Sequence, residues 1–285
     1  MADARRTDQV RYGTVDRDYG LHLATCDPAD DGPIWMVNLM KYREVADYGA
    51  GGADNSAPVS GAAADDRYAP VGVLAEIGAE VAFFGDVEIQ ALNPEPRWDR
   101  VGVVRYPTRR SFIEMQQRDD FQQQHVHKDA GMEQTIVMGC VPIGFPQASP
   151  DQVRPWDQVP NPPSESDGPV MVIHVVSFEI DGTADDPAMV TPDEMRRYSD
   201  AAATVAVEQG VRIAGWFGVE GTIVGDGRVW HQVRFNAFPS LAAFLVVVND
   251  PARLEAQQRH RERAIADTYT LITRPRIDRI EQLRS

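Results

Sequence analysis

The chain has 285 residues, 43% of them hydrophobic and 25% charged, which is typical of a folded globular protein. Its formal net charge of −15 argues against nucleic acid and anionic membrane surfaces as partners, because both attract clustered Lys and Arg. With no long apolar run, no signal-peptide pattern and only two cysteines, Cys26 and Cys140, the sequence predicts a cytoplasmic protein without a disulfide framework or a four-cysteine zinc site.

An internal repeat follows a polar N-terminal extension over residues 1–31. Three blocks recur in the same order, and their first residues are Gly32 and Gly168, Glu76 and Glu208, and Trp98 and Trp230. The first pair of blocks (GPIWMVNLMKYRE and GPVMVIHVVSFEI) aligns without a gap, and the other two pairs share one constant offset. The repeat indicates that one folding unit has been duplicated.

Each copy is predicted to run strand, helix, strand, strand, helix, strand. In the first copy the predicted ranges are strand 34–42, helix 65–77, strands 80–90 and 98–106, a helix ending near 133, and strand 135–141. In the second copy they are strand 170–178, helix 192–209, strands 211–224 and 229–238, a helix ending near 267, and strand 268–273.

Several helix ends are signalled by particular residues. The TPDE segment at 191–194 predicts a capping box at the start of a helix. Gly78 and Gly210 are expected to end the first helix of each copy in the left-handed conformation. Thr108 and Ser240 follow Pro107 and Pro239 respectively, and each is expected to cap the next helix.

This order of elements is the split βαβ motif, so the predicted fold class is α+β, with two ferredoxin-like βαββαβ units fused in tandem. The units are expected at 32–144 and 168–281, joined by a linker at 145–167 that contains six prolines. Two such units can bury their sheet faces against each other, which predicts an intramolecular barrel and either a monomeric pseudo-dimer or a homodimer. The long loops at 47–66 and 180–190 are either disordered segments or lids.

The chain resembles a family of unknown function within the dimeric α/β-barrel superfamily. The resemblance rests on VNLMKY in the first strand, the Arg-Tyr pairs at 67–68 and 197–198, and WDR leading into a strand that ends YPT. It is good over 32–142 and weaker over 168–274, where His174 stands in place of Asn38 and His231 in place of Asp99. The resemblance implies the fold and a pocket between sheet and helices. Similar barrels include cofactor-independent monooxygenases, isomerases, polyketide cyclases and, in tandem versions, haem enzymes.

His174 is the first candidate for a catalytic residue, because it interrupts an apolar strand. A buried imidazole has a depressed pKa, stays neutral and can act as a general base. Its repeat mate Asn38 is also polar, and two buried polar groups require partners that a pocket could supply. The alternative is a core histidine satisfied by one hydrogen bond.

His125 and His127 lie late in the second predicted helix of the first copy. Their spacing directs them to different helix faces, so they do not form a metal-binding pair. His125 is a catalytic candidate if it faces a pocket, and otherwise both belong to a solvated helix face. In a haem-binding version of the fold, one of these or His260 would be the axial ligand.

Matched aromatic residues are candidates for walls of the substrate pocket, although large rings more often anchor a core. These are Trp98 and Trp230, and Tyr68 and Tyr198, with His231 beside the second tryptophan.

Two arginines lie within predicted strands. A buried arginine requires a carboxylate, and for Arg105 and Arg234 this could be Asp86, Glu88 or an acidic substrate. Arg105 is therefore a catalytic candidate and Arg234 a substrate-binding one.

The sequence contains no phosphate-binding glycine loop, no Gly-x-Ser-x-Gly elbow, no His-Glu-x-x-His and no paired CxxC, so no metal site is predicted. It favours a cofactor-independent enzyme that acts on a hydrophobic or aromatic small molecule by general-base chemistry, as a monooxygenase, isomerase or cyclase does. In this hypothesis His174 is the base, and Asn38 and the arginines stabilise oxyanion charge. A haem enzyme and a non-catalytic metabolite-binding protein are the alternatives.

Overall fold

The structure is a computed structural model, and it describes residues 7–49, 58–68, 70–147, 153–179 and 186–284. The chain divides into two compact units, which are treated separately below. The first comprises Met1–Phe84, Pro96–Val141 and Gly221–Arg228, and the second comprises Gly85–Glu95, Pro142–Glu220 and Val229–Ser285. The residues of two long strands, β4 (Glu80–Leu92) and β8 (Arg212–Gly225), are divided between the units.

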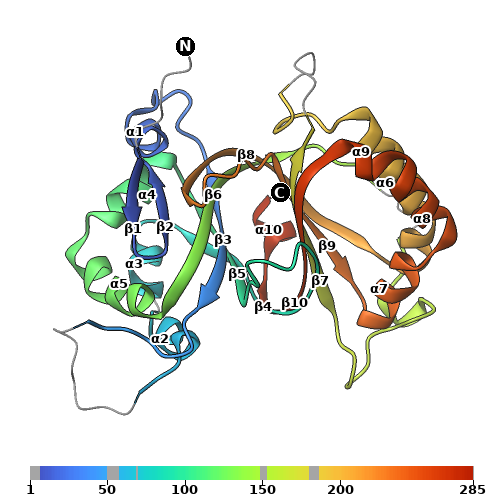
Figure 1. The fold of residues 1–285 in the computed structure, drawn as a ribbon, viewed down its shortest axis with the longest axis horizontal. Coiled ribbons are helices and arrows are strands. Elements are labelled where there is room, and N and C mark those ends of the chain that lie inside the picture. The colour runs from blue at the N-terminus through green and yellow to red at the C-terminus, as the bar shows by residue number, and fades with distance from the viewer. Residues whose placement is uncertain (1–6, 50–57, 69, 148–152, 180–185, 285) are drawn as a thin grey trace. The chain divides into compact units, whose positions relative to one another are not determined.

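The first unit combines an antiparallel sheet with helices (Figure 1). Besides part of β4, its elements are β1 (Thr7–Val10), β2 (Gly13–Asp16), α1 (Arg17–Thr25), β3 (Ile34–Tyr42), α2 (Gly61–Arg67), α3 (Val71–Glu76), β5 (Arg100–Tyr106), α4 (Arg109–Gln116), α5 (Asp119–Gly131) and β6 (Met132–Ile143). The strands run in the order β6-β3-β5-β4. One face of β3, through Ile34 and Met36, packs against Phe112, Met115 and Phe121 of the covering helices.

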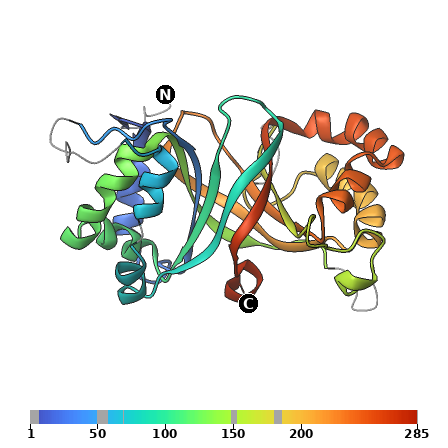
Figure 2. The same ribbon diagram turned by 90° about the horizontal axis from the view of Figure 1, so that it is seen from below.

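The second unit repeats this pattern. Besides part of β8, its elements are the 3-10 helix η1 (Trp156–Gln158), β7 (Val170–Phe178), α6 (Asp193–Glu208), β9 (Gln232–Phe238), α7 (Leu241–Val248), α8 (Pro251–Ala256), the π-helix η2 (Gln257–Arg261), α9 (Glu262–Ala264), β10 (Ile265–Asp278) and α10 (Ile280–Arg284). The sheet order is β10-β7-β9, and β8 pairs with the free side of β9. Helices α6 to α9 cover one face of this sheet (Figure 2).

The first strand of each copy has the bounds that the sequence predicts. The helix predicted over 65–77 is wrong in one respect, because the structure has two short helices there, α2 and α3. Pro70 lies between them, and a proline lacks the amide that would continue the first helix. The second helix of each copy is likewise divided into shorter helices, and the fourth strands begin three residues earlier than predicted.

Most of the predicted helix ends are confirmed. Gly78 and Gly210 have φ of 71° and 75°. The Thr108 hydroxyl accepts a hydrogen bond from the amide of Ser111, and Ser240 caps α7 in the same way. The capping box at 191–194 is wrong: α6 begins at Asp193 after Pro192 with no side-chain cap, because the Thr191 hydroxyl is bound by an arginine from the sheet.

The N-terminal extension is structured from Thr7 onward, which the sequence did not indicate. Strands β1 and β2 form a hairpin, and the Asp16 carboxylate accepts from two amides at the start of α1. Tyr19 then packs directly against Gly139 and Gly221, where a Cβ atom would overlap its ring. Such long-range packing leaves no local signal in a polar segment.

The two long loops are only partly described, because residues 50–57 and 180–185 lie outside the described residues. In the linker, Trp156 donates a hydrogen bond to the Gly210 carbonyl at 2.8 Å, and Val159 is buried. The described part of this connector is therefore packed on the second unit. In the described part of the chain, no helix has the length and apolar character needed to cross a membrane.

The two helix-ending glycines provide a matched test of this packing. Gly78→Ala is expected to destabilise the protein by about 1 kcal/mol, because alanine is strained at positive φ. Gly210→Ala adds a clash, since its Cβ would lie 2.6 Å from Val159 Cγ1 whereas that of Gly78 has 3.8 Å to Pro107. We expect it to destabilise by about 2 to 3 kcal/mol in urea unfolding. Equal losses would show that the linker does not pack on Gly210.

Candidate functional site

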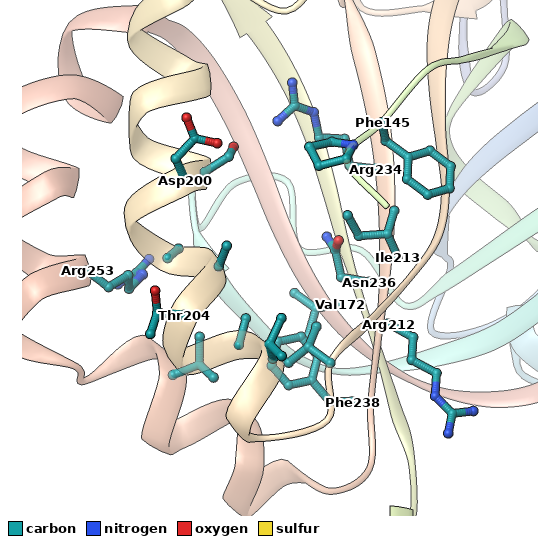
Figure 3. A pocket seen from close by; sticks show the side chains of 18 of the residues that line it. Phe145, Val172, Asp200, Thr204, Arg212, Ile213, Arg234, Asn236, Phe238 and Arg253 are labelled. Carbon is teal, nitrogen blue, oxygen red and sulfur yellow. The ribbon is translucent and has the colours of Figure 1, made fainter. Parts of the chain in front are cut away.

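A cavity of about 870 Å³ lies in the second unit, between the sheet and its covering helices (Figure 3). Its walls come from α6, α7 and α8 on one side and from β7, β8 and β9 on the other. Much of the lining is apolar, and it includes Val172, Met195, Val207, Ile213, Phe238 and Phe244. Polar lining groups include His174, Tyr198 and Arg234, so the structure brings these three predicted residues to one cavity.

His174 lies on β7, opposite Arg234 on β9 and Thr270 on β10. Its Nδ1 is 3.1 Å from the Thr270 hydroxyl oxygen. Burial, and to a smaller extent the positive charges of Arg261, Arg234 and Arg253, together lower the pKa of His174 to about 3. The imidazole is therefore uncharged at neutral pH. The lowered pKa agrees with the direction that the sequence predicts.

Arg234 is buried, with 2% of its surface exposed. Its guanidinium donates to the Gln232 side-chain oxygen at 2.6 Å and to the Thr191 hydroxyl at 2.9 Å, and it stacks 4.0 Å from the centre of the Trp216 ring. These partners are all neutral. Burial and the nearby Arg261 lower the pKa of Arg234 to about 9.

Two further arginines reach the cavity around Tyr198. Arg253 Nε donates to the Tyr198 hydroxyl at 3.0 Å, and the Arg253 guanidinium lies 5.6 Å from the ring centre. Arg261 lies 5.9 Å from that ring on its π-helical turn and is 6% exposed. Its Nη2 is buried and has no hydrogen-bond partner among the described residues. Figure 3 shows Arg253 approaching from the helices and Arg234 from the sheet.

The other three predicted catalytic residues belong to the first unit and do not line this cavity. Asn38 donates to the Met36 carbonyl at 3.1 Å and accepts from Lys128 Nζ at 3.4 Å. His125 Nε2 is 3.3 Å from the Tyr12 hydroxyl. Arg105 is half-buried on β5.

The carboxylates proposed for the strand arginines have other partners. Asp86 pairs with Arg276, and Glu88 accepts from Arg274 at 3.0 Å. Neither therefore neutralises Arg234.

The predicted aromatic residues divide between the core and the site. Trp98 and Trp230 are 1% and 3% exposed and lie in the interior rather than in the cavity lining. Tyr68 packs against Phe121 and His125 in the first unit. His231 accepts from the Phe178 amide at 2.8 Å and stacks on that ring, so it too is a structural residue.

The histidines considered as axial haem ligands lie elsewhere. His127 Nδ1 is 2.9 Å from the Tyr48 hydroxyl, and His260 Nδ1 is 2.6 Å from a Glu194 carboxylate oxygen. Of the described histidines, His174 alone lines the cavity. Within the described ranges, no group of three or more His, Cys, Asp or Glu side chains is placed to hold a metal ion.

Arg253 and Arg261 are two of the lining residues that the sequence prediction missed. Both lie in a charged stretch, RLEAQQRHRERA, that reads as a solvated helix face. The sequence did contain one signal. The difference in residue number between matched positions of the two copies increases by one along this helix, which indicates that the second copy has an added residue there.

No family model matches the sequence, and no curated protein matches it. Among solved structures, the chain is similar to a protein of unknown function from Rhodopseudomonas palustris, at 23% identity over 50% of this chain and 100% of that chain, with a TM-score of 0.38. It is also similar to a mutant chlorite dismutase from Candidatus Nitrospira defluvii, at 15% identity over 93% and 98% of the two chains, with a TM-score of 0.46. A candidate monooxygenase from Lactobacillus acidophilus matches at 12% identity over 86% and 94%, with a TM-score of 0.42.

Proposed function

We propose that this chain is a cofactor-independent enzyme that removes a proton from a hydrophobic or aromatic small molecule in the cavity of the second unit. The observation on which this rests is that a neutral histidine, His174, shares an 870 Å³ cavity with an apolar wall and five arginines. Three of these, Arg261, Arg234 and Arg253, are near enough to lower its pKa by their charge. Proton abstraction from carbon next to a carbonyl requires an unprotonated base and groups that stabilise the negative charge that develops on oxygen. Isomerases, cyclases and cofactor-independent monooxygenases can all begin with that step.

The roles of the residues follow from their chemistry. His174 is proposed as the base, and Arg234, Arg253 and Arg261 as the groups that stabilise an oxyanion. The sequence-based hypothesis gave that role to Asn38, Arg105 and Arg234, and of these only Arg234 is kept. A histidine with a pKa of about 3 is a weak base, but negative charge that develops beside the arginines offsets their fields and raises its pKa during the reaction.

We further propose that each unit is a ferredoxin-like copy. Support comes from the order strand, helix, strand, strand, helix, strand in each copy. Further support is that the fourth, first, third and second strands are neighbours in that order in both units.

The test is solvent deuterium incorporation next to the carbonyl of phenylpyruvate and of phenylacetone, followed by NMR. The protein is expected to accelerate exchange of at least one of them. His174→Asn, which introduces the residue found at the matching position of the first copy, is expected to slow that exchange at least tenfold because it removes the base. His127→Gln, in the first unit, is the control and is expected to exchange at the original rate.

Exchange that is equally fast in His174→Asn would show that His174 is not the base. Exchange of neither ketone above the uncatalysed rate would count against the enzyme and favour a metabolite-binding protein.

The haem alternative has one specific observation in its favour. His174 lines the cavity, and its Nδ1 lies beside the Thr270 hydroxyl, so its other ring nitrogen would be the one to hold a haem iron. The arginines could bind the propionates. If haem binds, His174→Asn should change the absorbance spectrum that appears on titration with haemin, and the absence of any spectral change with the original protein would dismiss this alternative.

A further inference from the structure

We propose that the cavity of the second unit binds an organic carboxylate with an apolar body, and that Arg261, Arg253 and Arg234 hold its carboxylate group. The inference takes its site from the proposed function and names the substrate class, but it concerns binding and does not require turnover.

The first argument is uncompensated positive charge. Arg234 and Arg261 are 2% and 6% exposed, and neither forms a salt bridge with a described residue. Acidic side chains do line the cavity, but all three are exposed to solvent; they are Asp200, Glu208 and Glu281. A buried guanidinium without a carboxylate is unfavourable, and an anionic ligand would remove that penalty.

The buried arginine of the first unit shows the usual solution. Arg100 is 2% exposed, and its Nη1 lies 3.2 Å from Asp65 and 2.8 Å from Asp66. In the first unit, the buried Arg100 is thus paired with carboxylates. In the second unit, the buried Arg234 and Arg261 are not paired with a carboxylate of a described residue. Buried Nη2 of Arg261, which has no partner among the described residues, is the donor that a ligand carboxylate would satisfy.

The second argument is that Arg261 lies on a local change in the helix. Helices α5 and α8 begin at Asp119 and Pro251, at the offset that also relates Trp98 to Trp230. Arg43 and Glu179 are matched positions of the ungapped first block. The Arg43 amide donates a hydrogen bond to the Gly131 carbonyl, and the Glu179 amide donates one to the Ala264 carbonyl. Gly131 and Ala264 are therefore matched positions at the ends of these helices. The offset there is one residue larger, so the second copy has one added residue within this helix.

That added residue is accommodated by the π-helical turn Gln257–Arg261. Such turns occur as single insertions in α-helices, frequently at functional sites. Allowing for the insertion, Arg261 corresponds to Lys128, and both cations lie over matched tyrosines: Lys128 is 5.5 Å from the Tyr68 ring centre.

The remaining two arginines have no basic counterpart in the first copy. Arg253 corresponds to Phe121, and Arg234 to Gly102. Phe121 is fully buried against Tyr68 and His125, so aromatic rings occupy this part of the first unit. The first copy therefore has one cation where the second has three, which assigns anion binding to the second unit.

The third argument concerns the rest of the ligand. The cavity lining includes hydrophobic side chains, among them Val172, Phe238, Phe244 and Val247. Its volume of about 870 Å³ is in the range of sites for drug-sized molecules. A small inorganic anion would leave these apolar walls uncovered, whereas an aryl or alkyl carboxylate would cover them.

Binding of an anion would also act on His174. All three arginines lower the pKa of His174 by their charge, so a bound carboxylate that offsets them raises it. The ligand would thereby make the proposed base stronger only when substrate is present.

The test compares three acids with their primary amides by isothermal titration calorimetry on the full chain: 3-phenylpropionate, 1-naphthylacetate and 4-biphenylacetate. Each amide keeps the apolar body and loses the charge. At least one acid is expected to bind with a Kd at least tenfold lower than that of its amide. Arg261→Met is expected to weaken binding of that acid at least tenfold and to leave amide binding unchanged. Arg259→Met is the control, because Arg259 lies on the same turn but is exposed and pairs with Glu255.

Equal affinity for acid and amide, no binding of any acid at millimolar concentration, or unchanged acid binding by Arg261→Met would overturn the proposal. Methionine should be tolerated at 261, because it removes an unpaired buried charge. If that variant does not fold, Arg253→Gln provides the same comparison. Acid binding that persists in a protein without deuterium exchange would support this inference and count against the proposed enzyme, so the two failures can be told apart.

Discussion

Replacing Asp65 with asparagine is expected to lower the free energy of unfolding by about 3 kcal/mol, because it removes the buried carboxylate beside the buried Arg100 charge and leaves the exposed carboxylate of Asp66. Asp65 is 5% exposed and accepts hydrogen bonds from the Tyr42 hydroxyl at 2.5 Å and from Arg100 at 3.2 Å. The neutral amide would leave the Arg100 guanidinium in the interior of the first unit, stacked on Tyr42 and Phe84. Urea unfolding of both proteins measures the loss.

Asp66 supplies the matched control. It also pairs with Arg100, at 2.8 Å, but 51% of its side chain is exposed. Solvent screens such a carboxylate, so Asp66→Asn is expected to change stability by less than about 1 kcal/mol. Similar losses for the two variants would show that burial of Asp65 does not determine the energy of this ion pair.

The second large effect is a pH dependence of stability from His174. Burial and the three arginines lower the pKa of His174 to about 3 in the folded protein, from 6.5 for the unperturbed group. Below pH 6.5 the unfolded chain therefore binds a proton that the folded protein does not, and the free energy of unfolding falls as the pH is lowered towards 3. Above pH 6.5 the histidine is neutral in both states and contributes no pH dependence.

The variant His174→Asn isolates this contribution, because asparagine does not titrate. Relative to the variant, the original protein is expected to lose about 2 to 3 kcal/mol between pH 7.5 and pH 4.5. Carboxylates titrate equally in both proteins, so they cancel in the difference between two urea titrations. A constant difference across this range would show that His174 is solvated enough to keep an ordinary pKa. Saturation with a bound carboxylate should reduce the slope, because it offsets the arginine charges.

The strands and most helix ends of each copy could be predicted because their signals are local. The run Val170–Phe178 is apolar and β-branched whatever surrounds it, and Gly210 ends a helix because of its own backbone freedom. Predictions failed where a side chain has a distant partner. Thr191 looks like a cap but is bound by Arg234, and Tyr19 owes its position to glycines far along the chain.

The candidate site could be predicted in part. His174 and Arg234 stand out because a polar side chain in an apolar strand is conspicuous. Arg253 and Arg261 do not stand out, because charged residues are ordinary on a helix. The sequence feature that marks this helix is the one residue added to it, at the π-helical turn Gln257–Arg261. The insertion becomes visible only when the two copies are aligned over their whole length.

By itself the sequence determined that the chain is a repeat of one α+β pattern, that it is acidic, and that His174 occupies an apolar strand. Periodicity and composition are properties of neighbouring residues, so they can be read without coordinates. The tertiary structure decided which copy contains the cavity and which charges meet there. Hydrogen bonding and charge pairing depend on residues brought together from distant parts of the chain, as Arg234, Arg253 and Arg261 are around His174.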